Sequence, residues 1–153
     1  MKTLVFALSL LVFPFVSQAQ MAQYEFQLKG NEIELKFMIH RTELIQFQIN
    51  ECDIQAETAE CTTLYLGSRS SFSVNGMELD FELNNYHMQG TKLVMYLRAP
   101  APFDEIQDLS ITTDAFYEFN PSFRNLYILN IGPFQGSRQL TIDNPSLDLS
   151  QEN

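Results

Sequence analysis

Apolar and polar residues alternate on both sides of Asn75-Gly76, within the segment 70–83. Asn-Gly is typical of a two-residue type I′ hairpin turn, because both residues accept the positive φ angles that the turn requires. With that turn, one face of the ribbon is apolar apart from one serine, in the pairs Val74–Met77, Phe72–Leu79 and Ser70–Phe81. The other face carries the polar pairs Ser73–Glu78 and Ser71–Asp80. The pattern predicts a half-buried antiparallel ribbon whose apolar face is covered by the other strands.

Residues 22–39 show the same alternation around Gly30-Asn31, which is also an acceptable two-residue turn. This turn pairs apolar residues on one face, namely Leu28–Ile33, Phe26–Leu35 and Tyr24–Phe37. It pairs opposite charges on the other face, namely Lys29–Glu32 and Glu25–Lys36. Because one register sorts apolar and charged residues at once, we predict an antiparallel hairpin here.

Residues 40–69 keep neither period. The stretch from Glu43 to Ile49 is compatible with a helical turn or with a strand. The stretch from Asp53 to Leu66 has a helical composition, with Gly67 as a stop signal. We expect a short helix or an ordered crossover in this region.

The second half of the chain is a series of short apolar segments separated by turn signals. Apolar positions change from odd to even numbers across Asn84-Asn85, which predicts a β-bulge or a bend. Gln89-Gly90 predicts a turn, and Leu93–Leu97 is apolar on both faces, which predicts a central strand. Further strands are expected over 106–113, 126–131 and 138–142, with a loop at 132–137. The polar residues 143–153 are expected to form a flexible, solvated tail.

Together these elements predict an all-β fold, an immunoglobulin-like antiparallel β-sandwich of seven or eight strands with one short helical or irregular crossover. The composition agrees, since the chain has 13 Phe and 6 Tyr and aromatic residues favour strands. A length of 153 residues with 45% hydrophobic residues suits one domain, expected over 20–142.

The N-terminus has the pattern of an export signal. Lys2 precedes an apolar run from Leu4 to Val16, and Ser17-Gln18-Ala19 places small residues at the positions that a signal peptidase reads. The run is shorter than the roughly 20 residues that a membrane span needs. We therefore expect residues 1–19 to be removed, no transmembrane segment after cleavage, and a periplasmic or extracellular location.

Charge and cysteine content narrow the expected partners. Removal of 1–19 leaves 9 − 1 = 8 basic residues against 19 acidic ones, a net charge of −11, which argues against nucleic acid and anionic membrane surfaces. Cys52 and Cys61 are an even pair in an exported chain, which predicts a structural disulfide. Their spacing is not that of a Cys-x-x-Cys redox motif, and His40 and His87 do not complete a metal-ligand pattern with them.

No catalytic motif is apparent. The serines of 68–73 do not sit in Gly-x-Ser-x-Gly, and no phosphate-binding loop or metal cluster is visible, so we expect no cofactor, no metal and no catalytic residues. A hydrolase using paired acids such as Asp104-Glu105 with His40 or His87 is the less favoured alternative.

An aromatic cluster is a candidate contact site for a ligand or a partner, besides the unpaired edge that every open sheet offers: Phe116, Tyr117, Phe119 and Phe123, with Tyr127 close by. Such rings, next to Asn120 and Asn125, are able to stack on a sugar. The favoured interpretation is that they fill one end of the sandwich core, with carbohydrate binding as the alternative.

The chain resembles a family of small exported bacterial proteins of uncharacterised function, with a signal peptide and an immunoglobulin-like sandwich. The similarity rests on segments that lie mainly on strands: Ser71-Phe72-Ser73-Val74-Asn75-Gly76, Thr113-Asp114-Ala115-Phe116, Asn125-Leu126-Tyr127-Ile128 and Arg138-Gln139-Leu140. Members are expected to carry a His-Pro pair near the mature N-terminus, where this chain has Gln20-Met21-Ala22-Gln23. The resemblance implies a fold and a compartment but no activity. We accordingly expect a non-enzymatic protein that binds another envelope protein or a glycan, or serves as an accessory component of the envelope.

Overall fold

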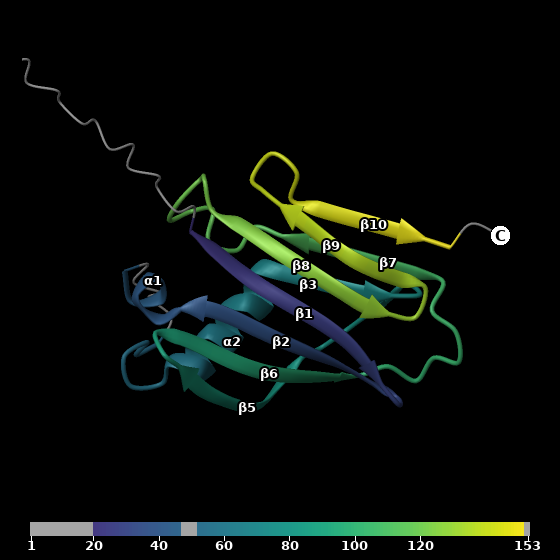
Figure 1. Ribbon diagram of the computed structural model, residues 1–153, viewed down its shortest axis with the longest axis horizontal. Helices are drawn as coiled ribbons and strands as arrows, with labels where there is room; N and C mark the ends of the chain where they lie inside the picture. Colours follow the sequence, from purple (N-terminus) through teal and green to yellow (C-terminus); the bar gives the residue numbers. More distant parts are fainter. Residues whose placement is uncertain (1–19, 47–51, 152–153) are drawn as a thin grey trace, which may run out of the picture.

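Ten strands in two facing sheets make up most of the computed structural model, which describes residues 20–46 and 52–151 (Figure 1). This is the sandwich-like all-β fold that the alternation predicts, although with more strands than the seven or eight expected. The predicted leader, residues 1–19, lies outside the described residues.

The larger sheet has six strands in the order β5-β6-β2-β1-β8-β9. Their bounds are β1 Met21–Lys29, β2 Glu32–His40, β5 Glu82–Gln89, β6 Lys92–Pro100, β8 Arg124–Ile131 and β9 Phe134–Leu140. The predicted register of the β1–β2 hairpin is confirmed, from Tyr24–Phe37 to Lys29–Glu32. The predicted bulge is confirmed too, since the pairing of β5 with β6 shifts between Leu83 and Asn85.

One pair in this sheet departs from the prediction of a wholly antiparallel fold. Strand β1 runs parallel to β8, with Tyr24 beside Tyr127. A parallel pair requires a long crossover instead of a turn, and its partners here are about a hundred residues apart in sequence. No local sequence pattern predicts this parallel pairing of β1 with β8.

The smaller sheet has four strands in the order β10-β7-β3-β4, with β3 Ser70–Val74, β4 Met77–Glu78, β7 Asp108–Thr113 and β10 Ser146–Ser150. The Asn75-Gly76 turn has positive φ angles of 51° and 76°, and it pairs Val74 with Met77 as predicted. The Leu79 N–H still donates to the Phe72 carbonyl at 2.7 Å, but the ribbon is shorter than expected, because the chain then leaves β3 and joins the larger sheet as β5. The other edge of β3 pairs with β7.

Two further expectations about the C-terminal part are wrong. The last segment is not a solvated tail over its whole length, since Ser146–Ser150 pair with β7 as strand β10. The segment 132–137 is not a loop throughout, since β9 begins at Phe134 and pairs with β8 directly after a turn at Gly132-Pro133. In both places backbone pairing with a neighbouring strand overrides a polar, glycine-containing sequence.

The ambiguous region 40–69 contains two helices instead of one, α1 Arg41–Gln46 and α2 Thr58–Arg69. The predicted helix therefore exists but begins later than Asp53 and continues through Gly67, which does not stop it. Residues 47–51, part of the stretch that was compatible with helix or strand, lie outside the described residues. Helix α2 lies behind β2 and β6, beside the smaller sheet (Figure 1).

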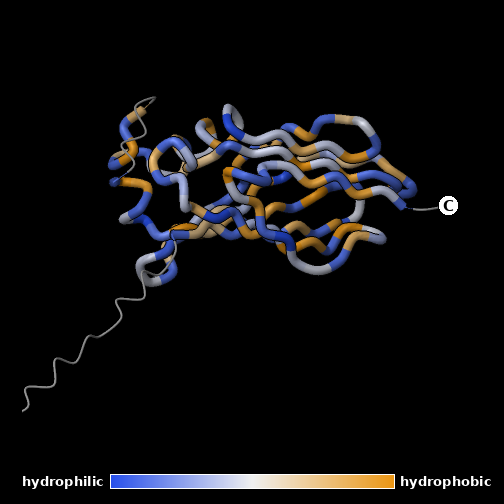
Figure 2. Tube along the Cα trace, turned by 90° about the horizontal axis from the view of Figure 1, so that it is seen from above, coloured by the Kyte–Doolittle hydropathy of each residue, from blue (hydrophilic) through white to orange (hydrophobic). Residues whose placement is uncertain are grey.

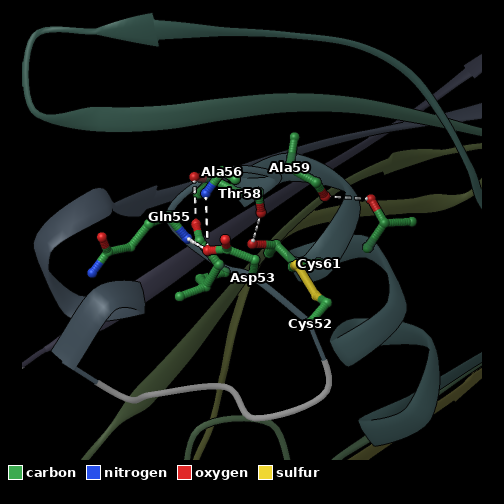
Figure 3. Close-up of a disulfide and its surroundings, with 10 residues drawn as sticks. Cys52, Asp53, Gln55, Ala56, Thr58, Ala59 and Cys61 are labelled. Carbon is green, nitrogen blue, oxygen red and sulfur yellow. Dashed lines mark hydrogen bonds between the residues drawn. A yellow bond between two sulfur atoms is a disulfide. The ribbon is translucent and has the colours of Figure 1, made fainter.

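A disulfide joins the segment that precedes α2 to the first turn of that helix (Figure 3). Cys52 and Cys61 form the bond with their Cα atoms 5.8 Å apart, as predicted. Between them, Asp53 Oδ1 accepts hydrogen bonds from the backbone N–H groups of Gln55 (3.1 Å) and Ala56 (3.2 Å). The segment before α2 is therefore fixed both covalently and by a turn.

The core lies between the two layers and is rich in aromatic rings. Orange apolar and blue polar positions alternate along the strands of both layers (Figure 2). Phe72 of the smaller sheet meets Phe26 and Tyr127 of the larger one, with ring centroids 5.3 and 6.4 Å apart. Tyr24 and Tyr127 stack at 4.4 Å across the parallel pair. Such ring contacts add to the stabilisation that burial alone provides.

Replacing Val74 by Asp is expected to destabilise the protein by about 3–5 kcal/mol, because Val74 is fully buried and a carboxylate there has no partner. The matched control is Ser73→Asp on the opposite face of β3, which should change the free energy of unfolding by less than about 1 kcal/mol. Urea unfolding of both variants measures the difference. Equal stability of Val74→Asp and wild type would contradict the position of β3.

Removing the disulfide by Cys52→Ser with Cys61→Ser should cost about 2–3 kcal/mol, because the bond closes a loop with a sequence separation of 9. Urea unfolding measures this cost. The wild-type protein should also resist thiol alkylation until it is reduced. Rapid labelling of both cysteines without reductant is the result that rules out the bond.

Candidate functional site

A cavity of about 350 Å³ opens between helix α2, the inner face of the larger sheet and the crossover from β4 to β5. It lies at the boundary between the smaller sheet and α2, which both pack on the inner face of the larger sheet. Its walls therefore come from elements far apart in the sequence.

The floor of this α2 pocket is apolar. Leu35 and Leu97 lie side by side in the register of β2 and β6, and both are buried. Tyr24, Leu66 and Phe72 complete the floor, and each is buried as well. A floor of this kind favours the apolar part of a ligand, because burying apolar surface is stabilising by about 25 cal/mol per Å².

The helix side of the pocket presents small side chains. Thr63, Gly67 and Ser70 line it, and the two hydroxyls are already bonded within the protein. Thr63 Oγ1 donates to the Ala59 carbonyl at 2.9 Å, and Ser70 Oγ lies 2.7 Å from Thr113 Oγ1. A Cβ added at Gly67 would meet no atom within 4 Å, so this glycine leaves space open along the pocket wall.

The mouth of the α2 pocket carries two carboxylates, Glu78 and Asp80, which are both exposed. Neither has a basic side chain within 4.0 Å among residues 20–46 and 52–151. An unpaired acidic rim above an apolar floor suits a ligand with an apolar body and a cationic head.

Helix α2 is held in place by contacts at its C-terminal end. The Tyr65 hydroxyl accepts a hydrogen bond from the Phe116 N–H at 2.8 Å and donates to Glu118 at 3.0 Å. Arg69 forms an ion pair with the same Glu118 at 2.5 Å and with Asp114 at 3.5 Å. Burial raises the pKa of Tyr65 well above the ordinary phenol value, so its hydroxyl stays protonated and able to donate.

The predicted aromatic cluster lies under this end of the helix. Phe116, Tyr117 and Phe123 are buried, whereas Phe119 is 37% exposed. Phe116 packs against Phe123 and Tyr65 with centroid distances of 4.8 and 5.2 Å. Burial leaves three of these rings with no face on which a sugar could stack.

The two histidines lie on the outer face of the larger sheet, away from the α2 pocket. His87 stacks on Tyr96 with the ring centroids 5.9 Å apart. His40 Nδ1 lies 3.1 Å from Thr91 Oγ1 at the edge of a second cavity of about 400 Å³. Glu43 lines this second cavity as well, but no hydrogen bond joins its carboxylate to His40 among the described residues. The acids Asp104 and Glu105 lie elsewhere, on the segment after β6.

Within residues 20–46 and 52–151, no group of three or more His, Cys, Asp or Glu side chains has the geometry to hold a metal ion. In the same part of the chain, no helix has the length and apolar character that crossing a membrane demands.

Sequence reasoning did not find the α2 pocket. The sequence pattern identifies Glu78 and Asp80 only as polar residues of a ribbon, and Gly67 only as a stop signal for a helix. The one available signal was an isolated glycine within an otherwise helical composition, which costs helix stability and leaves that position of the helix without a side chain.

Comparison of the chain with protein-family models and with curated proteins finds no match. The resemblance to small exported bacterial proteins therefore stays a prediction, and the function has to be argued from the geometry.

Glu43, which lines the second cavity, makes a pH-dependent contribution to the stability of the folded protein. Burial raises the pKa of its carboxyl, although the basic groups His40, Lys92 and Arg124 line the same cavity. A raised pKa in the folded state stabilises the fold below the unfolded pKa, and this stabilisation is lost as the pH rises through the folded pKa. Glu43→Gln should therefore raise the Tm at neutral pH and change it little near about pH 3, where the carboxyl is protonated in both states.

Thermal melts of wild type and Glu43→Gln across this pH range measure the effect. The matched control is Glu57→Gln, an exposed glutamate at the start of α2, which should show no such pH-dependent difference. A lower Tm for Glu43→Gln at neutral pH would contradict the effect of burial on Glu43.

Proposed function

We propose that the chain is an exported, non-enzymatic binding protein of the bacterial cell envelope, with an immunoglobulin-like sandwich as its scaffold. Its ligand combines an apolar body with a cationic head and enters the α2 pocket. The observation that carries the proposal is that two carboxylates, Glu78 and Asp80, lie above an apolar floor and form no ion pair among residues 20–46 and 52–151.

Two features support export. The N-terminal sequence has the pattern of a cleaved signal, and the disulfide between Cys52 and Cys61 suits an oxidising compartment. A net negative charge across the chain adds long-range attraction for a cationic ligand.

The α2 pocket supports binding through both of its parts. The buried floor gains free energy from the apolar body, whatever the head group is. The exposed carboxylates contribute less, about 0.2–1 kcal/mol each, but they decide which head group is preferred. Specificity for a cation therefore comes from the rim, and most of the affinity comes from the floor.

Three probes with the same alkyl chain separate these contributions: octylamine, octanol and octanoate. Binding is followed by NMR shifts of the amide signals of Thr63 and Gly67, so that only the α2 pocket is measured. Octylamine should bind about threefold or more tightly than octanol, and octanoate should bind more weakly than either.

Two variants test the two parts of the α2 pocket. Gly67→Leu should weaken octylamine and octanol alike by about tenfold, because a Cβ there meets no atom within 4 Å and the longer side chain then occupies space in the pocket. It should not destabilise α2, since glycine is a poor helix former. Glu78→Gln with Asp80→Asn should remove the preference for the amine and leave octanol binding unchanged.

The matched controls are Ser68→Leu, on an exposed neighbouring position of α2, and Asp104→Asn with Glu105→Gln, two exposed acids outside the pocket. These variants should bind like wild type. No preference for octylamine over octanoate, or no difference between Gly67→Leu and Ser68→Leu, is the outcome that rejects the proposal.

A further inference from the structure

The basic residues of this acidic chain fall into two groups. Lys29, Lys36, Arg69 and Arg98 each have a carboxylate oxygen within 4.0 Å. The other bases of the described chain, Arg41, Lys92, Arg124 and Arg138, have none there. In a protein with a net charge of −10, cations without an acidic partner need a separate explanation.

Two of these unpaired bases, Lys92 and Arg124, line the second cavity of about 400 Å³. The strand registers bring them there, since Lys92 lies beside His40 across β6 and β2, and Arg124 lies beside Met21 across β8 and β1. Arg41 adjoins the same end of the sheet, where its backbone N–H donates to the Thr91 carbonyl at 3.0 Å. Three of the four unpaired bases therefore gather at one end of the larger sheet.

The walls of the cavity also offer apolar surface and one acid. Met21 is 40% exposed, and Met38 lies on the adjacent strand β2, on the same outer face. Glu43 reaches the cavity from α1, and one of its carboxylate oxygens is buried with no hydrogen-bond partner among residues 20–46 and 52–151. The second cavity shares no lining residue with the α2 pocket, so a ligand site here is independent of the proposed function.

We propose that this second cavity binds an organic oxyanion, a carboxylate or a phosphate monoester, through Lys92 and Arg124. A guanidinium presents two N–H groups in the spacing of two oxyanion oxygens, and an ammonium adds a compact positive charge. The thioether side chains of Met21 and Met38 contact the apolar part of the ligand. Glu43 favours ligands when it is protonated, because its carboxyl then donates a hydrogen bond instead of repelling the anion.

Octanoate and octyl phosphate are the probes, with octanol as the neutral reference of equal chain length. Binding is followed by NMR shifts of the amide signals of His40, Lys92 and Arg124 at low ionic strength. Both anions should shift these signals and bind about tenfold or more tightly than octanol. Their affinity should fall as salt is added, because exposed charges are screened.

The decisive variant is Lys92→Gln with Arg124→Gln, which should lose about tenfold or more in affinity for both anions. The matched control is Arg138→Gln, a base on β9 without an acidic partner and outside the cavity, which should bind like wild type. Equal loss in the control, or anion binding in wild type no stronger than octanol binding, overturns the proposal.

Lys92 and Arg124 are both exposed and make no ion pair within the described chain, so the double variant is expected to fold. If its thermal melt shows that it does not, the salt dependence of the wild-type protein decides. Anion affinity that stays constant as salt is added would overturn the assignment of these two bases as the binding groups.

Discussion

The parallel pairing of β1 with β8 is the contact on which the larger sheet depends. Strands β5, β6, β2 and β1 follow one another antiparallel on one side, and β8 and β9 form a hairpin on the other. Only β1 and β8 join these two groups. Their contact is reinforced by Asn125, which is fully buried, accepts from the Tyr24 hydroxyl at 3.1 Å and donates to the Ala115 carbonyl at 3.1 Å. Because a buried amide without partners is costly, these bonds specify which strand lies beside β1.

The width of the resulting sheet explains why a helix is needed. The smaller sheet covers the part of the inner face around Phe26 and Tyr127, which Phe72 of β3 contacts, and α2 covers the part over β2 and β6 (Figure 1). The disulfide fixes the beginning of the helix, and Tyr65 with Arg69 fixes its end. The α2 pocket lies at the junction between these two coverings, where a helix and a strand crossover do not fill the space between them.

The two cavities differ in charge because the acids and bases are unevenly placed. Glu78 ends β4 and Asp80 lies on the crossover that follows it, whereas Lys92 and Arg124 begin two strands at one end of the larger sheet. Elsewhere on the outer face, bases are matched by acids of neighbouring strands, as in the Lys36–Glu25 pair at 3.4 Å. The charged side chains that line the two cavities have no such ion pairs among residues 20–46 and 52–151.

The sequence by itself determined the features that depend on neighbours along the chain. Alternation and turn residues predicted the β1–β2 hairpin with its register, the Asn75-Gly76 turn and the bulge after Leu83. They also predicted that the two layers of the fold are β-sheets. Only the tertiary structure decided which distant strands meet, that Ser146–Ser150 join β7, and that a helix with Gly67 inside it closes the sandwich. For Phe116 and Phe123 the sequence favoured core packing, and the structure buries both rings. The physical reason is that alternation shows which face of a strand is buried, but not which distant element covers that face. Both cavities are lined by residues from elements that are distant in sequence, so their positions depend on the tertiary structure.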